Sequence, residues 1–599
     1  MTQEASASPV QQHSPAELHA AARKKIASGD LEGAEETLAI AFALDEHDTE
    51  AMCIMADLFE TAGQVMEAVG YAVLAINSGA PGHDIRKKFL RLARDMSFTH
   101  RNEKVESAIL NCLETPGLEF GGANVLWGNA QLINPEFGDL FARVVRKRLL
   151  PLGNPFDEVT DFSPLLRPFF LLGIAEIVVC FMPFEIFMTH LRRFLLEQQG
   201  AAKQKLAEKD YFSLVTAVAR YAFHSDYIMD VTAKEQKAAD ALRARVEAGE
   251  QDAGAVALLG CYVPLYCLKN ADAIEKHFSG ADAMGALMKL QIAEYRLLQE
   301  KARAVTAATP IADEISAKVK DMYEQFPYPR WRELEETEIT WRDRDTAVLS
   351  RPGATALVAG CGTGRESSQL AAAYPQAGVL AIDITTASLA YAMQKAEQYK
   401  LANLSYRQAD IFKLDALGKT FDYIHCVGVL HHLGDPEKGW EMLARQLNPG
   451  GVMHIGLYGE TPRRAIVEAR AAIARGKFPP THEGMRRFRK ESASLLKPES
   501  LATLLKARDY YFLTMYSDLL FHVHEDRFTI PRIQAALEKL GLVFGGFKLP
   551  ETVLDEFRKM FPDDPKGLEL GHWAAFEKMY PDTFIHSYKF WCRKKETAA

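Results

Sequence analysis

Apolar residues follow two different rhythms along the chain, and the change between them lies near residue 350. Before that point they recur every three or four positions, which is typical of amphipathic helices. Beyond it, short apolar runs alternate with helical stretches, as in a parallel sheet covered by helices on both faces. The pattern therefore predicts an all-α N-terminal part followed by an α/β doubly wound, Rossmann-like domain. The clearest helical stretches of the first part are 137–150, 184–198, 210–223 and 233–248.

Small residues near the N-terminus repeat at a constant offset of 34 residues, the period of tetratricopeptide (TPR) repeats. The first copy consists of Ala22, Gly29, Ala34 and Ala41, and the second of Ala56, Gly63, Ala68 and Ala75. We therefore expect TPR-like helix pairs over residues 15–97. Stacked pairs of this kind present a surface for a protein or peptide, and the alternative is a helical array used to form a homodimer.

Changes in composition divide the rest of the chain. Residues 1–14 are polar and are expected to be a disordered tail, and residues 98–310 to be an all-α middle domain. Residues 311–345 read as a connector, because prolines on both sides of Tyr328 forbid a regular helix. Residues 346–599 would form the α/β domain, interrupted by a helical, basic insertion at about 461–526.

Three glycines at every second position follow the first apolar run of the α/β part. Gly360, Gly362 and Gly364 separate a buried strand from a helix that begins near Glu366. Glycine allows a tight turn and a close approach of the backbone to a ligand. A strand, a glycine turn and a helix start are typical of nucleotide-binding α/β proteins.

Further strands of this part end in residues able to bind a nucleotide. The run 378–383 ends in Asp383, which can accept hydrogen bonds from two ribose hydroxyls. The run 404–410 ends in Asp410, whose side chain, or the backbone of Ile411, could read an adenine amino group. Because ligands of parallel sheets bind at the carboxyl ends of the strands, we expect these groups to converge with the glycine turn. Later strands are predicted at 421–428, 452–456 and 542–548, and an antiparallel last strand at 585–592.

The motifs together resemble class I S-adenosylmethionine (SAM) methyltransferases. They are V-A-G-C-G-T-G at 358–364, A-I-D at 381–383, Q-A-D at 408–410, the segment 421–433 and L-N-P-G-G at 447–451. The resemblance implies a SAM-dependent methyltransferase, with the cofactor contacts extended to Cys361, Ile384 and Val427. One position departs from the family, because Val358 stands where an acid usually supports the methionine amino group.

A wider resemblance is to bacterial multidomain proteins that join TPR repeats to such a domain. They carry the linker matched here by Tyr323–Trp331 and a late segment matched by Asp518–His522. Tyr323 and Arg330 are expected to cover the cofactor, with Arg330 pairing with a carboxylate, whereas Trp331 is expected to pack as a connector. The acceptor is not fixed by this resemblance.

Three histidines are candidates for catalysis. His431 and His432 follow the strand at 421–428, where acceptors meet the methyl group, and a reference pKa near 6.5 suits histidine to proton removal. His522 could reach the acceptor from a lid. It could also bind metal together with His524, but no third ligand is apparent, so we expect no metal. Packing or helix capping is the alternative role for His431 and His432, and an ordinary polar loop is the alternative for His522.

The net charge, the cysteines and the distribution of polar residues limit the compartment and the partners that the sequence predicts. The net charge is −9, and none of the eight cysteines forms a C-x-x-C pair, so a reducing cytoplasm fits best. The polar N-terminus is not a signal peptide, and charges and a proline interrupt the apolar run 169–188, so no membrane span is expected. The basic insertion has few aromatic residues, which argues against nucleic acid.

Three functions remain open on the sequence. The first is methylation of a protein or peptide acceptor that the helical repeats recruit. The second is methylation of a small molecule, lipid or glycan, with the repeats used for dimerisation. The third is a non-catalytic scaffold that retains the fold.

Overall fold

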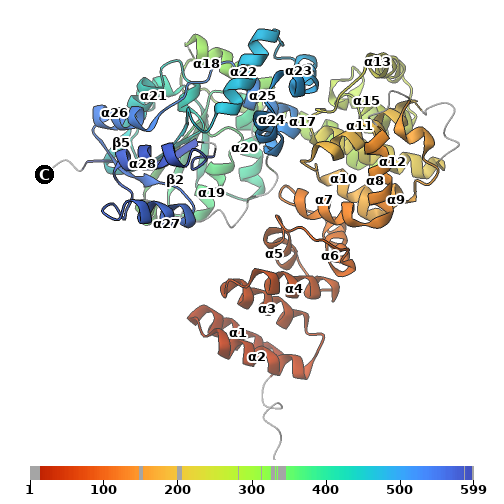
Figure 1. Ribbon diagram of the computed structural model, residues 1–599, viewed down its shortest axis with the longest axis horizontal. Coiled ribbons are helices and arrows are strands. Elements are labelled where there is room, and N and C mark those ends of the chain that lie inside the picture. The colour runs from red at the N-terminus through yellow and green to blue at the C-terminus, as the bar shows by residue number, and fades with distance from the viewer. Residues whose placement is uncertain are drawn as a thin grey trace, which may run out of the picture.

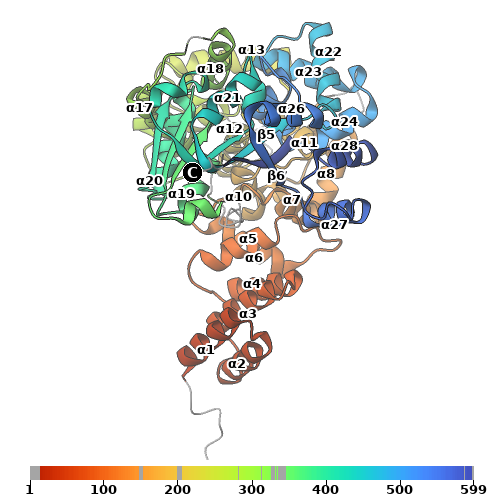
Figure 2. The same ribbon diagram turned by 90° about the vertical axis from the view of Figure 1, so that its left-hand side faces the viewer.

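The computed structural model describes residues 14–147, 153–197, 206–280, 282–311, 313–325, 331, 334, 346–585 and 587–595. A helical arm leads into a larger helical unit, and a unit built on a β-sheet lies beside the latter (Figure 1). The arm projects away from both units in the two perpendicular views (Figure 2).

The arm begins with two helix pairs. They are α1 (Pro15–Ser28) with α2 (Leu31–Leu44), and α3 (Thr49–Thr61) with α4 (Val65–Asn77). The repeated alanines are all buried where the helices meet. The repeated glycines lie at the turns with positive φ angles of 83° for Gly29 and 74° for Gly63. The 34-residue offset thus corresponds to two equivalent helix pairs, while their assignment as TPR repeats stays a prediction.

The helical unit continues from α5 to α17 with a single core. One cluster of buried apolar side chains extends from Met52 to Ile292, so the arm and the helical unit share their packing across the expected boundary at 97–98. The four helical stretches expected from the sequence correspond to α8, α11, α12 and α13. The helices are α5 (Asp84–Leu92), α6 (Glu103–Glu114), α7 (Asn124–Ile133), α8 (Pro135–Lys147), α9 (Ser163–Leu166), α10 (Pro168–Glu176), α11 (Met182–Glu197), α12 (Glu208–His224), α13 (Ala233–Glu247), α14 (Ala253–Leu259), α15 (Ala271–His277), α16 (Ala283–Met288) and α17 (Glu294–Ala304).

The second unit is built on a seven-stranded sheet with the order β3-β2-β1-β4-β5-β7-β6. Strands β1 to β5 are parallel, and β7 pairs antiparallel with both β5 and β6. This confirms the predicted α/β fold with an antiparallel last strand. The strands are β1 (Thr355–Ala359), β2 (Gly378–Asp383), β3 (Leu404–Gln408), β4 (Phe421–Val427), β5 (Leu447–Tyr458), β6 (Leu542–Phe547) and β7 (Ser587–Lys594).

Helices connect the strands and cover the sheet. Three strands differ from the sequence prediction by two residues or more. β3 ends at Gln408 rather than Asp410, β5 begins at Leu447 and includes the expected turn at 448–451, and β7 begins and ends two residues later than expected, at Ser587 and Lys594. The covering helices are α18 (Glu314–Gln325), α19 (Arg365–Ala373), α20 (Thr386–Gln398), α21 (Pro436–Arg445), α26 (Ile530–Leu540), α27 (Glu551–Met560) and α28 (Leu570–Met579).

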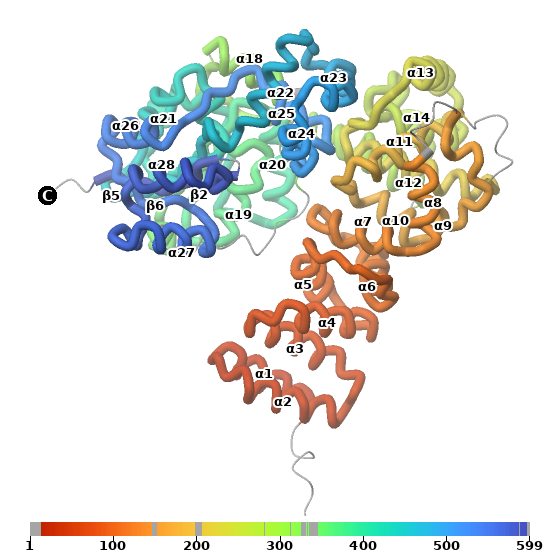
Figure 3. Tube along the Cα trace, viewed as in Figure 1, coloured from red at the N-terminus to blue at the C-terminus, as the bar shows by residue number. Residues whose placement is uncertain are grey.

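The basic insertion connects the two units. Its helices are α22 (Arg464–Gly476), α23 (His482–Leu495), α24 (Pro498–Lys506) and α25 (Leu513–Phe521), and in Figure 3 α22 to α24 lie between the sheet unit and the helical unit. Ile228 of the helical unit belongs to their core. Several of the arginines make buried contacts: Arg486 binds the Tyr227 carbonyl and Arg489 binds the Glu185 carboxylate. Arg486 and Arg489 therefore hold the two units together.

Candidate active site

The three glycines of the loop after β1 all have left-handed backbone conformations, with φ of 70°, 51° and 84°. A Cβ atom on Gly360 would lie 2.4 Å from a Val429 methyl carbon, and one on Gly364 would lie 2.5 Å from the Ala392 Cβ. Both therefore need to be glycine for packing as well as for conformation. The turn brings the backbone of Gly360, Cys361 and Gly362 to the wall of a cavity.

Asp383 at the end of β2 fixes the glycine loop and faces the same cavity. Its Oδ2 accepts a hydrogen bond from the Gly362 N–H at 2.8 Å, and its Oδ1 accepts the N–H and hydroxyl of Thr385. Burial raises the pKa of its carboxyl above the usual range. Oδ1 already accepts two hydrogen bonds, whereas Oδ2 accepts one, so the remaining lone pair on Oδ2 can accept one of the two ribose hydroxyls predicted from the sequence.

The expected adenine end of the site lies at the end of β3. Asp410 and Ile411 line the cavity, as do Ile384 and Val427. The Asp410 carboxylate accepts the Phe412 N–H, and the Asp410 N–H donates to the Thr309 hydroxyl. The cofactor residues predicted from the sequence and described in the structure thus meet on one edge of the sheet, except Gly364, which packs beneath it.

Tyr323, which was expected to cover the cofactor, lines the wall of the cavity. The Tyr323 hydroxyl at the end of α18 donates a hydrogen bond to the Asp518 carboxylate of α25. Trp331 is buried, and its Nε1–H donates to the Thr363 carbonyl in the glycine loop at 2.8 Å, in keeping with the expected connector. Arg330 lies outside the described residues.

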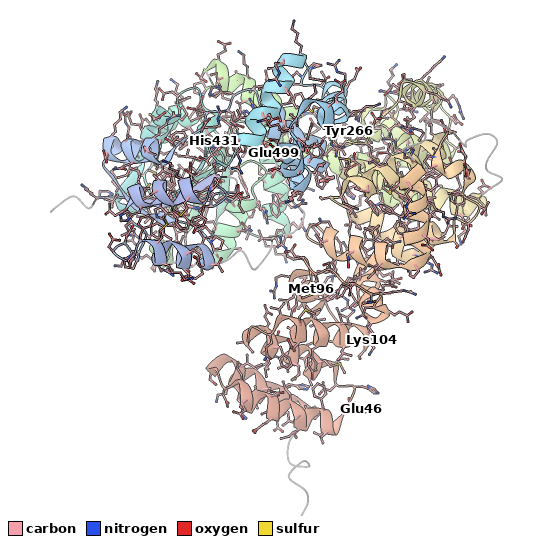
Figure 4. The ribbon with its side chains drawn as sticks, in the orientation of Figure 1. Glu46, Met96, Lys104, Tyr266, His431 and Glu499 are labelled. Carbon is pink, nitrogen blue, oxygen red and sulfur yellow. The ribbon has the colours of Figure 1, made fainter. Side chains whose placement is uncertain are left out.

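A single cavity of about 2130 Å³ joins the sheet edge to the helical unit. On the sheet side it reaches the glycine loop, Asp383 and His432, and on the insertion side it reaches Asp518. On the helical side it is lined by residues of α5, α12 and α17, and by Tyr266, whose ring stacks on that of Tyr295. In Figure 4, His431 marks the sheet unit and Tyr266 the helical unit, with Glu499 of the insertion between them in this view.

Backbone hydrogen bonds fix the protonated nitrogen of each predicted catalytic histidine. Nδ1 of His432 donates to the His524 carbonyl at 2.9 Å, which leaves a lone pair on Nε2. Nδ1 of His431 accepts the Tyr458 N–H, and Nδ1 of His522 accepts the His524 N–H, so both carry their proton on Nε2. His432 therefore offers an acceptor, while its two neighbours offer donors.

Burial changes the acid–base behaviour of this group. It lowers the pKa of His432 to about 3, and those of His431 and His522 well below the usual value. The three rings are thus neutral at physiological pH and are weak bases. His431 and His522 also lie behind the cavity wall rather than on it, so the reference pKa of 6.5 on which their predicted role depends does not apply here.

Asp518 has the opposite behaviour. It is buried, and burial raises the pKa of its carboxyl to about 7, against the opposing effect of the Tyr323 hydrogen bond. A base with a pKa near the working pH is the most effective proton acceptor. Asp518 is therefore better suited to accept a proton than any of the three histidines.

His432, Asp518 and His522 each place one potential metal-binding atom within 4.8 Å of the others. A metal-bound imidazole must offer a lone pair to the metal. Because Nδ1 of His522 accepts a backbone N–H, its Nε2 carries the proton and cannot serve as a ligand. With this tautomer of His522 the three side chains do not supply three metal-binding lone pairs.

A protein-family model described as a methyltransferase domain matches residues 350–484, the stretch that carries the glycine loop, Asp383, Asp410 and His432. These residues form a class I SAM-dependent methyltransferase domain. The SAM-binding type of fold expected from the motifs is thereby confirmed.

Relatives of the methyltransferase domain have different acceptors. The chain is 30% identical to the uncharacterized protein syc1184_c of Synechococcus over 284 residues, which are 43% of this chain and 66% of that protein. It is 35% identical to a trans-aconitate 2-methyltransferase of Deinococcus radiodurans, over 22% of this chain and 47% of the relative. The chain thus spans less than two thirds of these relatives.

Among solved structures, PKMT2 from Rickettsia typhi in complex with AdoHcy aligns at 16% identity and a TM-score of 0.32. The alignment covers 49% of this chain and 55% of that one. In the part of the chain that the structure describes, no helix is long and apolar enough to cross a bilayer.

The residues around the methyltransferase domain's cavity fit SAM. The glycine loop brings the backbone of residues 360–362 to the cavity wall, and the Asp383 carboxylate at the end of β2 keeps one lone pair for a hydroxyl group. Asp518 and Tyr323 were missed as a pair because 195 residues separate them. The sequence did offer one indication of Asp518. It lies four residues before His522 in a helix-forming segment, and this spacing predicts that the two side chains lie on one side of a helix.

Proposed function

We propose that this chain is a SAM-dependent methyltransferase that modifies a protein or peptide segment entering the cavity between its two units. The observation that carries the proposal is the continuity of that cavity from the cofactor loop to the helices of the N-terminal part. SAM, when bound, supplies an electrophilic methyl group on its sulfonium centre.

The residues of the sheet edge would hold the cofactor. The backbone at Gly360–Gly362 would lie against it, Asp383 would accept a hydrogen bond from its ribose through Oδ2, and Ile384, Asp410 and Ile411 would line the pocket of its base. Methyl transfer requires the acceptor atom to be aligned with the methyl group and water to be excluded. The buried position of His432 and Asp518 supports such an arrangement.

Asp518 would accept the proton of the acceptor group. The carboxyl has a pKa of about 7, so a substantial fraction is ionised at neutral pH. His432 would align the acceptor through the lone pair on its Nε2, and the Tyr323 hydroxyl would hold the Asp518 carboxylate in place. The proton would pass from the acceptor atom to a carboxylate oxygen as the new bond to the methyl carbon forms and the bond from that carbon to the sulfonium sulfur breaks, with the electron pair remaining on sulfur.

The size of the cavity supports a polymeric acceptor. Pockets for small ligands usually enclose about 300–1,000 Å³, whereas this cavity has about 2130 Å³ and reaches helices far from the glycine loop. The excess volume suits an extended chain segment. A methyltransferase for a small molecule, lipid or glycan is the competing function.

SAM binding is the first test, measured by isothermal titration calorimetry. Hydrogen bonds to a charged acceptor contribute about 1.5–3 kcal/mol each, so Asp383→Ala is expected to weaken SAM binding by at least about tenfold. The control is Asp555→Ala, which removes an exposed acid on α27. Equal SAM affinity in all three proteins would contradict the proposed cofactor site.

The acceptor class is tested with a cell extract, methyl-labelled SAM and mass spectrometry. Label on proteins is expected, and Tyr266→Ala in the cavity wall should raise the KM for that acceptor while leaving SAM affinity unchanged. Tyr580→Ala, an exposed tyrosine at the end of α28, is the control. Label confined to metabolites or lipids would favour the competing function. Deleting residues 1–97 is less informative, because the shared core begins at Met52.

A further inference from the structure

The helix that carries Asp518 has no cap of its own. In α25 (Leu513–Phe521) the N-cap position is occupied by Phe512, which makes no side-chain capping hydrogen bond. The first N–H groups of a helix have no partner within it and need one from outside. Neighbouring elements of the chain must therefore supply these partners.

The helical unit supplies them, from the turn that follows α12. The Ser225 carbonyl accepts the Leu513 N–H at 3.4 Å, and Asp226 Oδ2 accepts the Thr514 N–H at 3.4 Å. The same oxygen accepts the Thr514 hydroxyl. A carboxylate at this place is also favoured by the partial positive charge at a helix N-terminus. The turn, Ser225–Tyr227, thus caps α25 across the boundary between the two units.

The capping turn has an unusual backbone. Asp226 and Tyr227 both lie in the left-handed region, with φ of 52° and 59°, which costs free energy for residues with a Cβ atom. Surrounding contacts hold the conformation: the Tyr227 hydroxyl donates to the Gly260 carbonyl at 3.2 Å, and the Arg486 guanidinium donates to the Tyr227 carbonyl at 2.9 Å. A strained backbone of this kind persists only where surrounding contacts hold it in place, and such positions are frequent at functional sites.

Helix geometry connects this cap to the candidate base. Thr514 and Asp518 are four residues apart and lie on the same face of α25, and both side chains line the cavity. A helix of nine residues transmits a change at its first turn to its second. The position of the Asp518 carboxylate therefore depends on the contact with Asp226.

We propose that the Ser225–Tyr227 turn of the helical unit positions Asp518 by capping α25, so that Asp226 is a positioning residue for methyl transfer. This inference rests on the proposed function, because it gives the helical unit a role in the chemistry besides acceptor binding. The active site is then complete only when both units are docked.

The groups around Asp518 make its position measurable. It faces the Tyr323 hydroxyl from α18, the acids Asp509 and Glu525, and the Arg463 guanidinium, and it lies beside His432 and His522. A shift of α25 changes these distances, and with them the midpoint of the pH dependence of kcat.

The test compares full-length variants by kcat, pH profile and SAM affinity. Because small misplacements of reacting groups are costly, Asp226→Ala is expected to lower kcat by about tenfold and to move the pH midpoint, with SAM affinity unchanged. Asp226→Asn keeps an acceptor oxygen and should restore most of the rate. The matched control is Thr481→Ala, which removes the cap of α23 within the same insertion. It should lower the melting temperature without moving the pH midpoint.

An unchanged pH midpoint and kcat in folded Asp226→Ala would overturn the inference. If that variant does not fold, Thr514→Val removes the hydroxyl side of the same contact, and the same two outcomes apply. If the wild type transfers no methyl group, the proposed function fails separately. The inference is then tested by titrating the Asp518 carboxyl with ¹³C NMR in wild type and in Asp226→Ala. A different Asp518 pKa in the two proteins would support the inference, and the same pKa in both would overturn it.

Discussion

At the scale of single residues, burial determines what each side chain of the site can do. Asp518 and His432 lie close together, yet burial raises the pKa of the first to about 7 and lowers that of the second to about 3. Each shift favours the neutral form. A carboxyl and an imidazole thereby exchange their ordinary order of basicity, which assigns the proton-accepting role to the acid.

Gly360 offers the sharpest test of the cofactor loop. Gly360→Ala places a methyl group against Val429 in a left-handed backbone position, so it should lower stability by about 1–3 kcal/mol and abolish SAM binding. Thermal melting and calorimetry measure the two effects. Gly378→Ala is the control, because a Cβ there meets no atom within 4 Å and φ is not positive. Normal SAM binding by Gly360→Ala would contradict the need for a close backbone approach.

The sequence predicts single residues well only where their role follows from local pattern. The glycine loop and Asp383 could be placed because they immediately follow apolar strands whose ends share one sheet edge. Asp518 could not, since its role depends on burial and on partners from α18, the turn after β4 and the insertion. The three histidines were predicted as candidates from the sequence, but their tautomers were not. The tautomer of His431 is fixed by a backbone contact with β5, and those of His432 and His522 by backbone contacts with His524, after α25.

At the scale of elements, two adjacent strands carry a buried histidine pair that has no role in the proposed methyl transfer. His425 of β4 and His454 of β5 are register partners, and their Nδ1 atoms lie 3.2 Å apart, so one donates to the other. Burial lowers the pKa of His425 to about 3 and that of His454 well below its usual value. Both must therefore remain neutral in the folded sheet.

This pair predicts a loss of stability in acid. In the unfolded chain these histidines bind protons below pH about 6.5 and in the fold they do not, so stability falls by up to about 1.4 kcal/mol per pH unit per histidine as the pH decreases from 6.5 towards 3. His454→Phe should reduce that slope relative to the wild type. Melting temperatures of both proteins at pH 7 and pH 5 measure the difference. An identical loss on acidification in both would show that the pair does not contribute.

The sequence predicted secondary-structure elements well but not the contacts between distant elements, because periodicity reports only local structure. The helices α8, α11, α12 and α13 and most strands of the sheet were predicted to within about three residues, whereas β5 begins five residues earlier than predicted. The basic insertion was correctly expected to be helical. No local pattern, however, shows that Arg486 and Arg489 bind groups more than 250 residues earlier in the chain.

At the scale of the whole molecule, the insertion fastens the methyltransferase domain to the helical unit. The Arg489–Glu185 pair between α23 and α11 is buried on both sides, and Arg486 binds the turn that caps α25. The two units thus form one active site, with the cofactor edge on one and the wall of the acceptor cavity shared by both.

The buried pair predicts a large effect on assembly. Removing one partner leaves an uncompensated buried charge, so Glu185→Ala should lower stability by about 3–5 kcal/mol. Glu185→Leu combined with Arg489→Leu should recover most of this loss, because neither charge remains. Lys490→Ala, at the exposed pair with Asp230, is the control and should cost less than about 1 kcal/mol. Thermal melting and limited proteolysis between the units measure these effects. Equal stability of Glu185→Ala and Lys490→Ala would contradict the fastening role.

The most direct test of the proposed chemistry is the pH dependence of methyl transfer from labelled SAM to its protein acceptor, in wild type and Asp518→Asn. The wild-type rate is expected to rise with pH through about 7, as the Asp518 carboxyl loses its proton. Asp518→Asn should lower kcat by at least about a hundredfold and remove this dependence, while binding SAM with unchanged affinity. Transfer by Asp518→Asn at the wild-type rate and with the same pH profile would contradict the assignment of Asp518 as the base.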